Sequence, residues 1–143
     1  MKFRVPWNTT TWILALPLIA GAVAWQLGWI GGRSGSASVR IPELSSVAVL
    51  GQKAFDDNCA GCHGASGSGS DRGPPLIHDI YNPGHHADAA FYAAAGRGVR
   101  QHHWRFGNMP RQPQVSNSKM AAIIRYVREL QQANDITYRP HNM

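Results

Sequence analysis

Two cysteines and the histidine that follows them are the residues of this chain whose types and spacing best predict chemistry. Cys59 and Cys62 are its only cysteines and lie three positions apart, which excludes a disulfide framework. On a helical turn their sulfur atoms project to the same side. This suits thioether bonds to two neighbouring vinyl groups of one porphyrin, and His63 can then place a ring nitrogen beneath the iron. The motif Cys-Ala-Gly-Cys-His therefore predicts the covalent attachment of one haem.

Two other kinds of site use cysteines at this spacing. A thioredoxin-type redox pair belongs to a βαβ setting, and the sequence contains no convincing strand. A structural zinc site would need more Cys or His at ligand spacing. Both interpretations therefore account for the motif less well than haem attachment does.

Three segments with helical periodicity are predicted to position the motif. The first runs from about Ser45 to Asn58 and leads into Cys59, the second covers about 87–95, and the third covers about 117–133. The first has Val47, Leu50, Gly51, Ala54, Phe55 and Asn58 on one face, and the third has an apolar stripe of Met120, Ile123, Ile124, Val127 and Leu130. Ser116 or Ser118 is the expected N-cap of the third helix, while Gly96 and Gly98 are expected to end the second.

The segment from Gly64 to Gly84 is rich in glycine and proline and has no usable periodicity. A loop of about twenty residues would ordinarily count against a compact domain. Three short helices alone would also bury too little surface to be stable. Both objections disappear if a flat, largely apolar cofactor fills the centre and the loops wrap around it.

An uncharged apolar stretch from Trp12 to Ile30 precedes the predicted domain. Its nineteen residues would reach roughly 28 Å as a helix, close to the thickness of a bilayer's hydrocarbon core. Lys2 and Arg4 come before it, so the amino terminus is expected to stay in the cytoplasm and the remainder to be exported. The alternative is a signal peptide cleaved near Ala22 or Ala24, but the apolar run continues past both positions.

The positive charge of the chain lies mostly outside the predicted domain. Fourteen Lys and Arg stand against eight Asp and Glu, and four of the basic residues (Lys2, Arg4, Arg33 and Arg40) come before residue 41. The Gly- and Ser-rich run from Gly31 to Ser38 is expected to be a flexible tether. With the excess charge beside a membrane segment, no nucleic-acid binding is expected.

From about Gly51 to Leu130 the chain resembles the monohaem class I c-type cytochromes of the membrane-anchored bacterial type. The matching features are Gly51 and Phe55 in the first helix, CAGCH followed by Gly64, the run Gly73-Pro74-Pro75-Leu76, and Met109-Pro110 before a helix that bears Tyr126. In such proteins the first and last helices cross beside the haem. The resemblance implies that Gly51 permits this approach and that Phe55 and Tyr126 pack near the crossing.

The resemblance also implies that the carbonyl oxygen of Pro74 accepts a hydrogen bond from His63 and so orients its ring. A proline that only stiffens the loop is the simpler alternative, and Pro75 could take either role. Met109 is the candidate sixth ligand of the iron, because it lies in a loop stiffened by Pro110 and because Met/His ligation suits an electron carrier. Packing without ligation is the alternative for Met109.

Five further histidines complicate the ligand prediction: His78, the pair His85 and His86, and the pair His102 and His103. Any of them could give a bis-His centre, and they could also bind a second metal such as copper. A solvated surface, or partners for the haem propionates, is the simpler interpretation. Trp104 and Arg105 could likewise donate to a propionate.

Arg97, Arg100, Arg105 and Arg111 lie in a stretch without acidic residues, between Asp88 and Glu129. If this stretch surrounds the haem edge, it would steer docking to an acidic patch on a redox partner. A generic solvated face is the alternative.

Together these observations predict an all-α class I cytochrome c fold, with three to four short helices around one covalent haem c and an N-terminal single-span helix. The expected organisation is a signal-anchor over 1–30, a flexible linker over 31–45, the cytochrome domain over 46–136 and a tail over 137–143. The protein would be a single-pass protein of the cytoplasmic membrane, with its haem domain on the periplasmic side.

The predicted function is single-electron transfer rather than catalysis, with His63 and Met109 as axial ligands. The expected partners are membrane-associated redox proteins such as an oxidase, a reductase or a dehydrogenase. Two alternatives belong to other classes: a haem subunit inside an oxidase or dehydrogenase complex, and an open-site haem protein that binds gas or peroxide.

Overall fold

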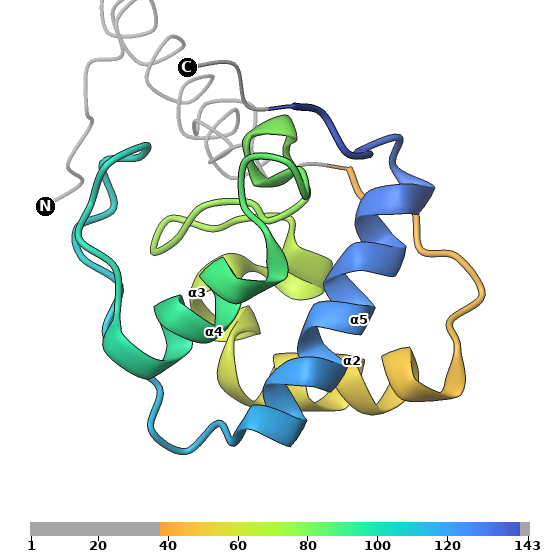
Figure 1. Ribbon diagram of the computed structural model, residues 1–143, viewed down its shortest axis with the longest axis horizontal. Coiled ribbons are helices and arrows are strands. Elements are labelled where there is room, and N and C mark those ends of the chain that lie inside the picture. The colour runs from red at the N-terminus through yellow and green to blue at the C-terminus, as the bar shows by residue number, and fades with distance from the viewer. Residues whose placement is uncertain (1–37, 141–143) are drawn as a thin grey trace, which may run out of the picture. The chain divides into compact units, whose positions relative to one another are not determined.

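Four α-helices and two short 3₁₀ helices make up the regular structure of residues 38–140, the part of the chain that this computed structural model describes (Figure 1). In chain order they are α2 (Ser46–Asn58), α3 (Ala60–His63), η1 (Ala65–Gly67), η2 (Asp79–Tyr81), α4 (Asp88–Arg97) and α5 (Asn117–Ala133). Extended pairing within these residues is limited to one isolated antiparallel bridge, between Val99 and Met109. The all-α architecture predicted for the domain is therefore confirmed.

The three predicted helices are present, and their ends have clear local causes. The Ser45 hydroxyl accepts a hydrogen bond from Ala48 N at 3.3 Å, and the Ser116 hydroxyl accepts one from Lys119 N at 3.3 Å, so each serine caps its helix. Helix α4 continues through Gly96 and ends only at Gly98. The reason is that Gly98, at φ +77°, adopts the left-handed conformation that ends a helix.

Helices α2 and α5 form the centre of the domain and cross each other (Figure 1). The predicted stripe of α5 is buried in full, together with Tyr126 and Gln131. The rings of Phe55 and Tyr126 pack with centroids 5.6 Å apart, as the resemblance implied. Burial of such apolar and aromatic side chains is the main favourable contribution to folding.

The face that α2 presents to the core differs from the predicted one. Ala48, Gly51 and Phe55 are buried, whereas Val47 and Leu50 are exposed, Leu50 by 67%. The predicted buried face of α2 was too wide. This helix packs mainly against one other long helix, so only a narrow stripe of its residues is buried. Val47 and Leu50 lie beside this stripe rather than on it.

Gly51 allows the close contact between α2 and α5. A Cβ atom at this position would lie 2.0 Å from the carbonyl oxygen of Ala122 and 2.9 Å from Tyr126 Cβ. The first obstacle is the backbone of α5, which cannot move without shifting the whole helix. Any side chain at position 51 must therefore push the two central helices apart.

We expect Gly51→Ala to lower the free energy of unfolding by about 1–3 kcal/mol or more. Alanine gains about 1 kcal/mol of helix propensity over glycine, which is too little to offset a collision with backbone. Gly96→Ala is the matched control, because Gly96 is also helical but a Cβ there would meet nothing within 4 Å. Urea unfolding of the full-length haem-loaded variants, followed by circular dichroism, should show a loss for the first and none for the second. Equal stability of the two variants would contradict this packing.

The segment between α3 and α4 contains η1 and η2 and is held to α5 by polar side chains. The buried amide of Gln131 donates to the carbonyl oxygens of Leu76 and Tyr81, both at 3.0 Å. Arg128 donates to the Tyr81 carbonyl at 3.0 Å and to the Gln131 side-chain oxygen at 2.6 Å. These bonds satisfy carbonyl groups that a loop would otherwise leave unpaired in the interior.

Residues at both ends of the described range also contact the domain. Arg40 N donates to the Asn134 side-chain oxygen at 2.8 Å, and the Asn134 amide donates back to the Arg40 carbonyl at 2.8 Å. Arg139 forms an ion pair with Asp79 at 3.1 Å. The last part of the predicted 31–45 linker and the start of the predicted 137–143 tail are thus held against the helices.

Within residues 38–140 the structure has no helix with the length and hydrophobicity of a membrane span. The predicted span Trp12–Ile30 lies outside these residues.

Candidate functional site

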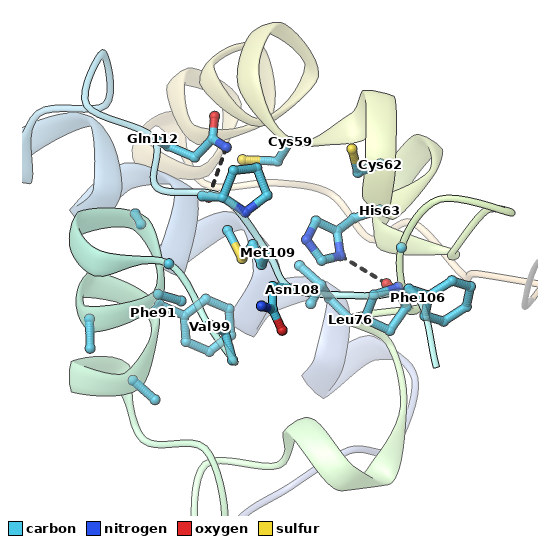
Figure 2. Close-up of a pocket in the computed structure, with 18 of the residues that line it drawn as sticks. Cys59, Cys62, His63, Leu76, Phe91, Val99, Phe106, Asn108, Met109 and Gln112 are labelled. Carbon is cyan, nitrogen blue, oxygen red and sulfur yellow. Dashed lines mark hydrogen bonds between the residues drawn. The ribbon is translucent and has the colours of Figure 1, made fainter. Parts of the chain in front are cut away.

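The five predicted site residues line one cavity of about 520 Å³ (Figure 2). Cys59 lies at the junction of α2 and α3, Cys62 and His63 lie in α3, Pro74 lies in the following loop, and Met109 lies between α4 and α5. The cavity volume falls within the range of about 300–1,000 Å³ typical of ligand and cofactor sites. The fold thus brings together residues from three separate parts of the sequence.

The two cysteines are positioned by the turn that joins α2 to α3. Cys59 N donates to the Phe55 carbonyl at 2.7 Å, and the Cys59 carbonyl accepts from the backbone N of Cys62 and His63 at 3.0 and 2.9 Å. Neither cysteine forms a disulfide. Burial, together with the neighbouring Cys62, raises the pKa of the Cys59 thiol to about 11. Both cysteine side chains therefore face the cavity from one short helical turn.

The ring of His63 is oriented by the backbone of the next loop. Its Nδ1 lies 2.9 Å from the carbonyl oxygen of Pro74, to which it donates a hydrogen bond. Burial lowers the pKa of His63, and this hydrogen bond opposes the effect in part. A neutral ring that donates from Nδ1 keeps the Nε2 lone pair available for a metal.

Met109 is held in place through its backbone. Its N–H donates to the Val99 carbonyl and its carbonyl accepts from Val99 N, both at 3.0 Å. Gly98 makes this bridge possible, because a Cβ there would lie 2.6 Å from the Met109 carbonyl oxygen. Farther along the same loop, Gln101 N donates to the Asn108 side-chain oxygen at 2.9 Å. Backbone hydrogen bonds between Val99 and Met109 therefore hold together the two ends of the loop that leads to the predicted distal ligand.

The remainder of the cavity wall is largely apolar and has one unsatisfied polar atom. Leu76, Phe91 and Val99 are among the lining residues. The indole nitrogen of Trp104 is buried and has no acceptor at good hydrogen-bond geometry, although it interacts with the Tyr81 hydroxyl. A buried donor without an acceptor costs about 1–3 kcal/mol.

These features fit haem, which combines a flat apolar ring with two carboxylate side chains. The apolar wall matches the ring, and the Trp104 N–H matches a carboxylate acceptor. Burial raises the pKa of the Tyr81 phenol, which also lines the cavity, and the nearby Trp104 indole partly offsets this rise. Tyr81 and Phe91 had no signal in the sequence that marked them as site residues, whereas Trp104 was considered because it is close to Met109 in sequence.

Three of the other described histidines also line this cavity. His86, His102 and His103 line it, and His85 contacts the ring of His86 with centroids 4.5 Å apart. Burial lowers the pKa of His86, and the neighbouring histidines lower it further against a hydrogen bond with the Ile80 carbonyl. His78 instead accepts a hydrogen bond from Ile80 N at 3.2 Å and packs edge-on against Trp104. The assignment of the distal ligand to Met109 rather than to a histidine stays a prediction.

The four arginines singled out in the sequence surround part of the same site. Arg97 and Arg100 line the cavity, and all four of Arg97, Arg100, Arg105 and Arg111 are exposed. Over residues 38–140, none of the ion pairs includes any of them. Their charge is thus directed to solvent near the cavity.

Comparison with known proteins gives one match. Residues 48–131 match the model of the family described as Cytochrome c. No curated protein and no solved structure matches the chain.

Proposed function

This chain belongs to the cytochrome c family, and on that premise we propose that it is a single-electron carrier with one haem c under His63 and Met109 ligation. Family membership supports covalent haem and haem-based electron transfer. The observation that carries the finer proposal is the convergence of Cys59, Cys62, His63 and Met109 on one largely apolar cavity (Figure 2).

Each residue has a distinct task in this proposal. The haem, when bound, supplies an iron that changes between the ferrous and ferric states. The two cysteines would hold the porphyrin covalently beside α3. His63 binds the iron through Nε2 while the Pro74 carbonyl retains the proton on Nδ1. Met109 would be the second protein ligand of the iron, and its thioether would favour the ferrous state and so raise the potential.

The surroundings of the cavity limit the chemistry to electron transfer. If both His63 and Met109 bound the iron, no substrate could reach the metal. Leu76, Phe91 and Val99 keep water from the ring and thereby lower the local dielectric constant. Trp104 would donate from its indole nitrogen to a propionate, which would give this buried N–H an acceptor.

We propose a membrane-associated redox protein with an acidic docking surface as the partner. The exposed arginines Arg97 and Arg100 at the cavity, with Arg105 and Arg111, support this choice because complementary charge speeds association. The apolar stretch Trp12–Ile30 supports a single-pass anchor, and the preceding Lys2 and Arg4 support a haem domain on the periplasmic side.

Carbon monoxide added to the reduced full-length protein tests the closed site. We expect no change in the visible spectrum on the timescale of mixing, because Met109 already occupies the position that the gas would take. Met109→Ala should bind carbon monoxide stoichiometrically and serves as the positive control. Rapid stoichiometric binding by the unmodified protein would exclude Met109 ligation and favour an open-site protein.

A further inference from the structure

Three histidines form a group beside the cavity that the proposed electron transfer does not use. One ring nitrogen of each of His85, His86 and His103 lies within 4.8 Å of those of the other two. The His103 ring lies 5.1 Å from the His85 ring and 5.3 Å from the His86 ring, measured between centroids. His85 and His86 follow η2, whereas His103 comes from the loop between α4 and α5. The fold therefore assembles this group from two distant segments.

The backbone that carries His85 and His86 is held by buried groups. The side-chain oxygen of Asn82, a residue only 8% exposed, accepts hydrogen bonds from Gly84 N at 2.9 Å and His85 N at 3.2 Å. Arg128 on α5 donates to the His86 carbonyl at 2.5 Å. The positions of both rings are thus set by the core rather than by a loose surface loop.

We propose that His85, His86 and His103 bind one late first-row divalent metal ion, with copper(II) bound most tightly. Imidazole nitrogens suit zinc, copper and nickel, and the absence of carboxylates from this group makes it unsuitable for magnesium or calcium. Among the suitable ions the general order of affinity places copper(II) first. These histidines are not the proposed iron ligands, although His86 and His103 also line the cavity, and the site does not depend on the function proposed above.

The geometry needs only small movements to accept an ion. Metal–nitrogen bonds of about 2.0–2.1 Å place two ligand atoms roughly 2.8–4.2 Å apart, from neighbouring positions in a tetragonal site to opposite ones. The present spread of up to 4.8 Å is close to this range, and rotation of an exposed ring such as His103 can close the difference. Solvent on that side supplies water for the remaining coordination position.

A carbonyl group provides the outer contact that metal-binding imidazoles usually have. The Ile80 oxygen lies 2.7 Å from His86 Nδ1 and 3.0 Å from His85 Nδ1. The two Nδ1 atoms also lie 2.7 Å from each other, so one of them carries a proton and the other accepts a hydrogen bond. The ring that donates from Nδ1 to the Ile80 carbonyl offers Nε2 to the ion, in the same way that Pro74 orients His63.

Isothermal titration of the full-length, haem-loaded ferric protein with copper(II) at neutral pH tests the proposal. We expect one saturable site per chain. His103→Ala removes an exposed ligand, and His86→Gln keeps a donor for the Ile80 carbonyl. Each should weaken copper binding by at least about tenfold, since even outer contacts of metal sites contribute that much. An unchanged haem spectrum in each variant shows that the domain has folded.

His78→Asn is the matched control, because asparagine retains the acceptor that caps η2 while removing a histidine outside the group. Its copper affinity should equal that of the unmodified protein. The proposal is overturned if the unmodified protein has no saturable site, as would happen if the histidines were occupied by haem propionates. It is also overturned if His103→Ala and His86→Gln bind copper as tightly as His78→Asn does.

Discussion

The double variant Cys59→Ala, Cys62→Ala is expected to contain no covalently bound haem, a complete loss compared with one haem per chain in the unmodified protein. Both sulfur atoms lie on one helical turn at the cavity and no other cysteine exists in the chain, so no second attachment point is available. The measurement is the intact mass of the denatured full-length protein, together with haem staining of a denaturing gel. The mass should fall by one haem and the stained band should disappear.

Denaturation makes this result independent of whether the double variant folds, because only a covalent bond survives it. Met109→Leu is the matched control. It changes a residue of the same cavity that takes no part in haem attachment, so this variant should keep its covalent haem in full. Haem that remains attached to the denatured double variant would contradict the assignment of the cysteines. So would haem that dissociates from the denatured unmodified protein.

The variant Met109→Leu is expected to have a midpoint potential lower by about 0.1 V or more. The identity of the axial ligands changes haem potentials over a range of about 0.8 V, and the expected shift lies at the small end of that range. Leucine keeps the volume of the side chain but removes the sulfur that stabilises the ferrous state. The measurement is a redox titration of the full-length protein followed by its visible spectrum. The ferric variant should also lose any absorption that arises from an iron–sulfur bond.

Met120→Leu is the control for this prediction, because Met120 is the other methionine that lines the cavity. It belongs to the buried stripe of α5 and is only 6% exposed. Its replacement should leave the potential nearly unchanged. A large fall in potential for Met120→Leu, with no change for Met109→Leu, would show that Met120 rather than Met109 is the distal ligand.

The helices of the domain could be predicted from sequence because their signals are local. The buried stripe of α5 repeats every three to four residues, and its cap at Ser116 is a serine next to the first turn. The buried face of α2 was harder, since Val47 and Leu50 are as apolar as the residues that do pack. Which apolar residues face inward depends on how many neighbours a helix has, and periodicity alone does not contain that information.

The long segment between α3 and α4 could not be predicted, because its structure depends on distant side chains. Gln131 and Arg128 lie on the helix that ends the domain, yet they hold the carbonyl groups of Leu76 and Tyr81. The only sequence signal was a polar side chain beside an apolar stripe, which is also what a solvated helix edge looks like. The histidine group illustrates the same limit, since its three members become neighbours only through the fold.

The site residues also divide into those that a local motif predicts and those that only the fold brings together. Cys59, Cys62 and His63 are adjacent in sequence, so a local motif was enough to place them together. Met109 reaches the same cavity from another loop, through its backbone bridge to Val99. Its proximity to the motif residues is therefore a property of the structure, although its role as a ligand remains a prediction from the sequence.

The most direct test of the central claim is a spectroelectrochemical titration of the unmodified full-length protein. A one-electron carrier predicts one haem per chain and a single reversible transition with a one-electron slope. The oxidative and reductive directions should overlay, with a six-coordinate spectrum at both ends. A reduced form that is five-coordinate, or a titration whose two directions do not overlay, would contradict a carrier whose two axial ligands stay bound throughout.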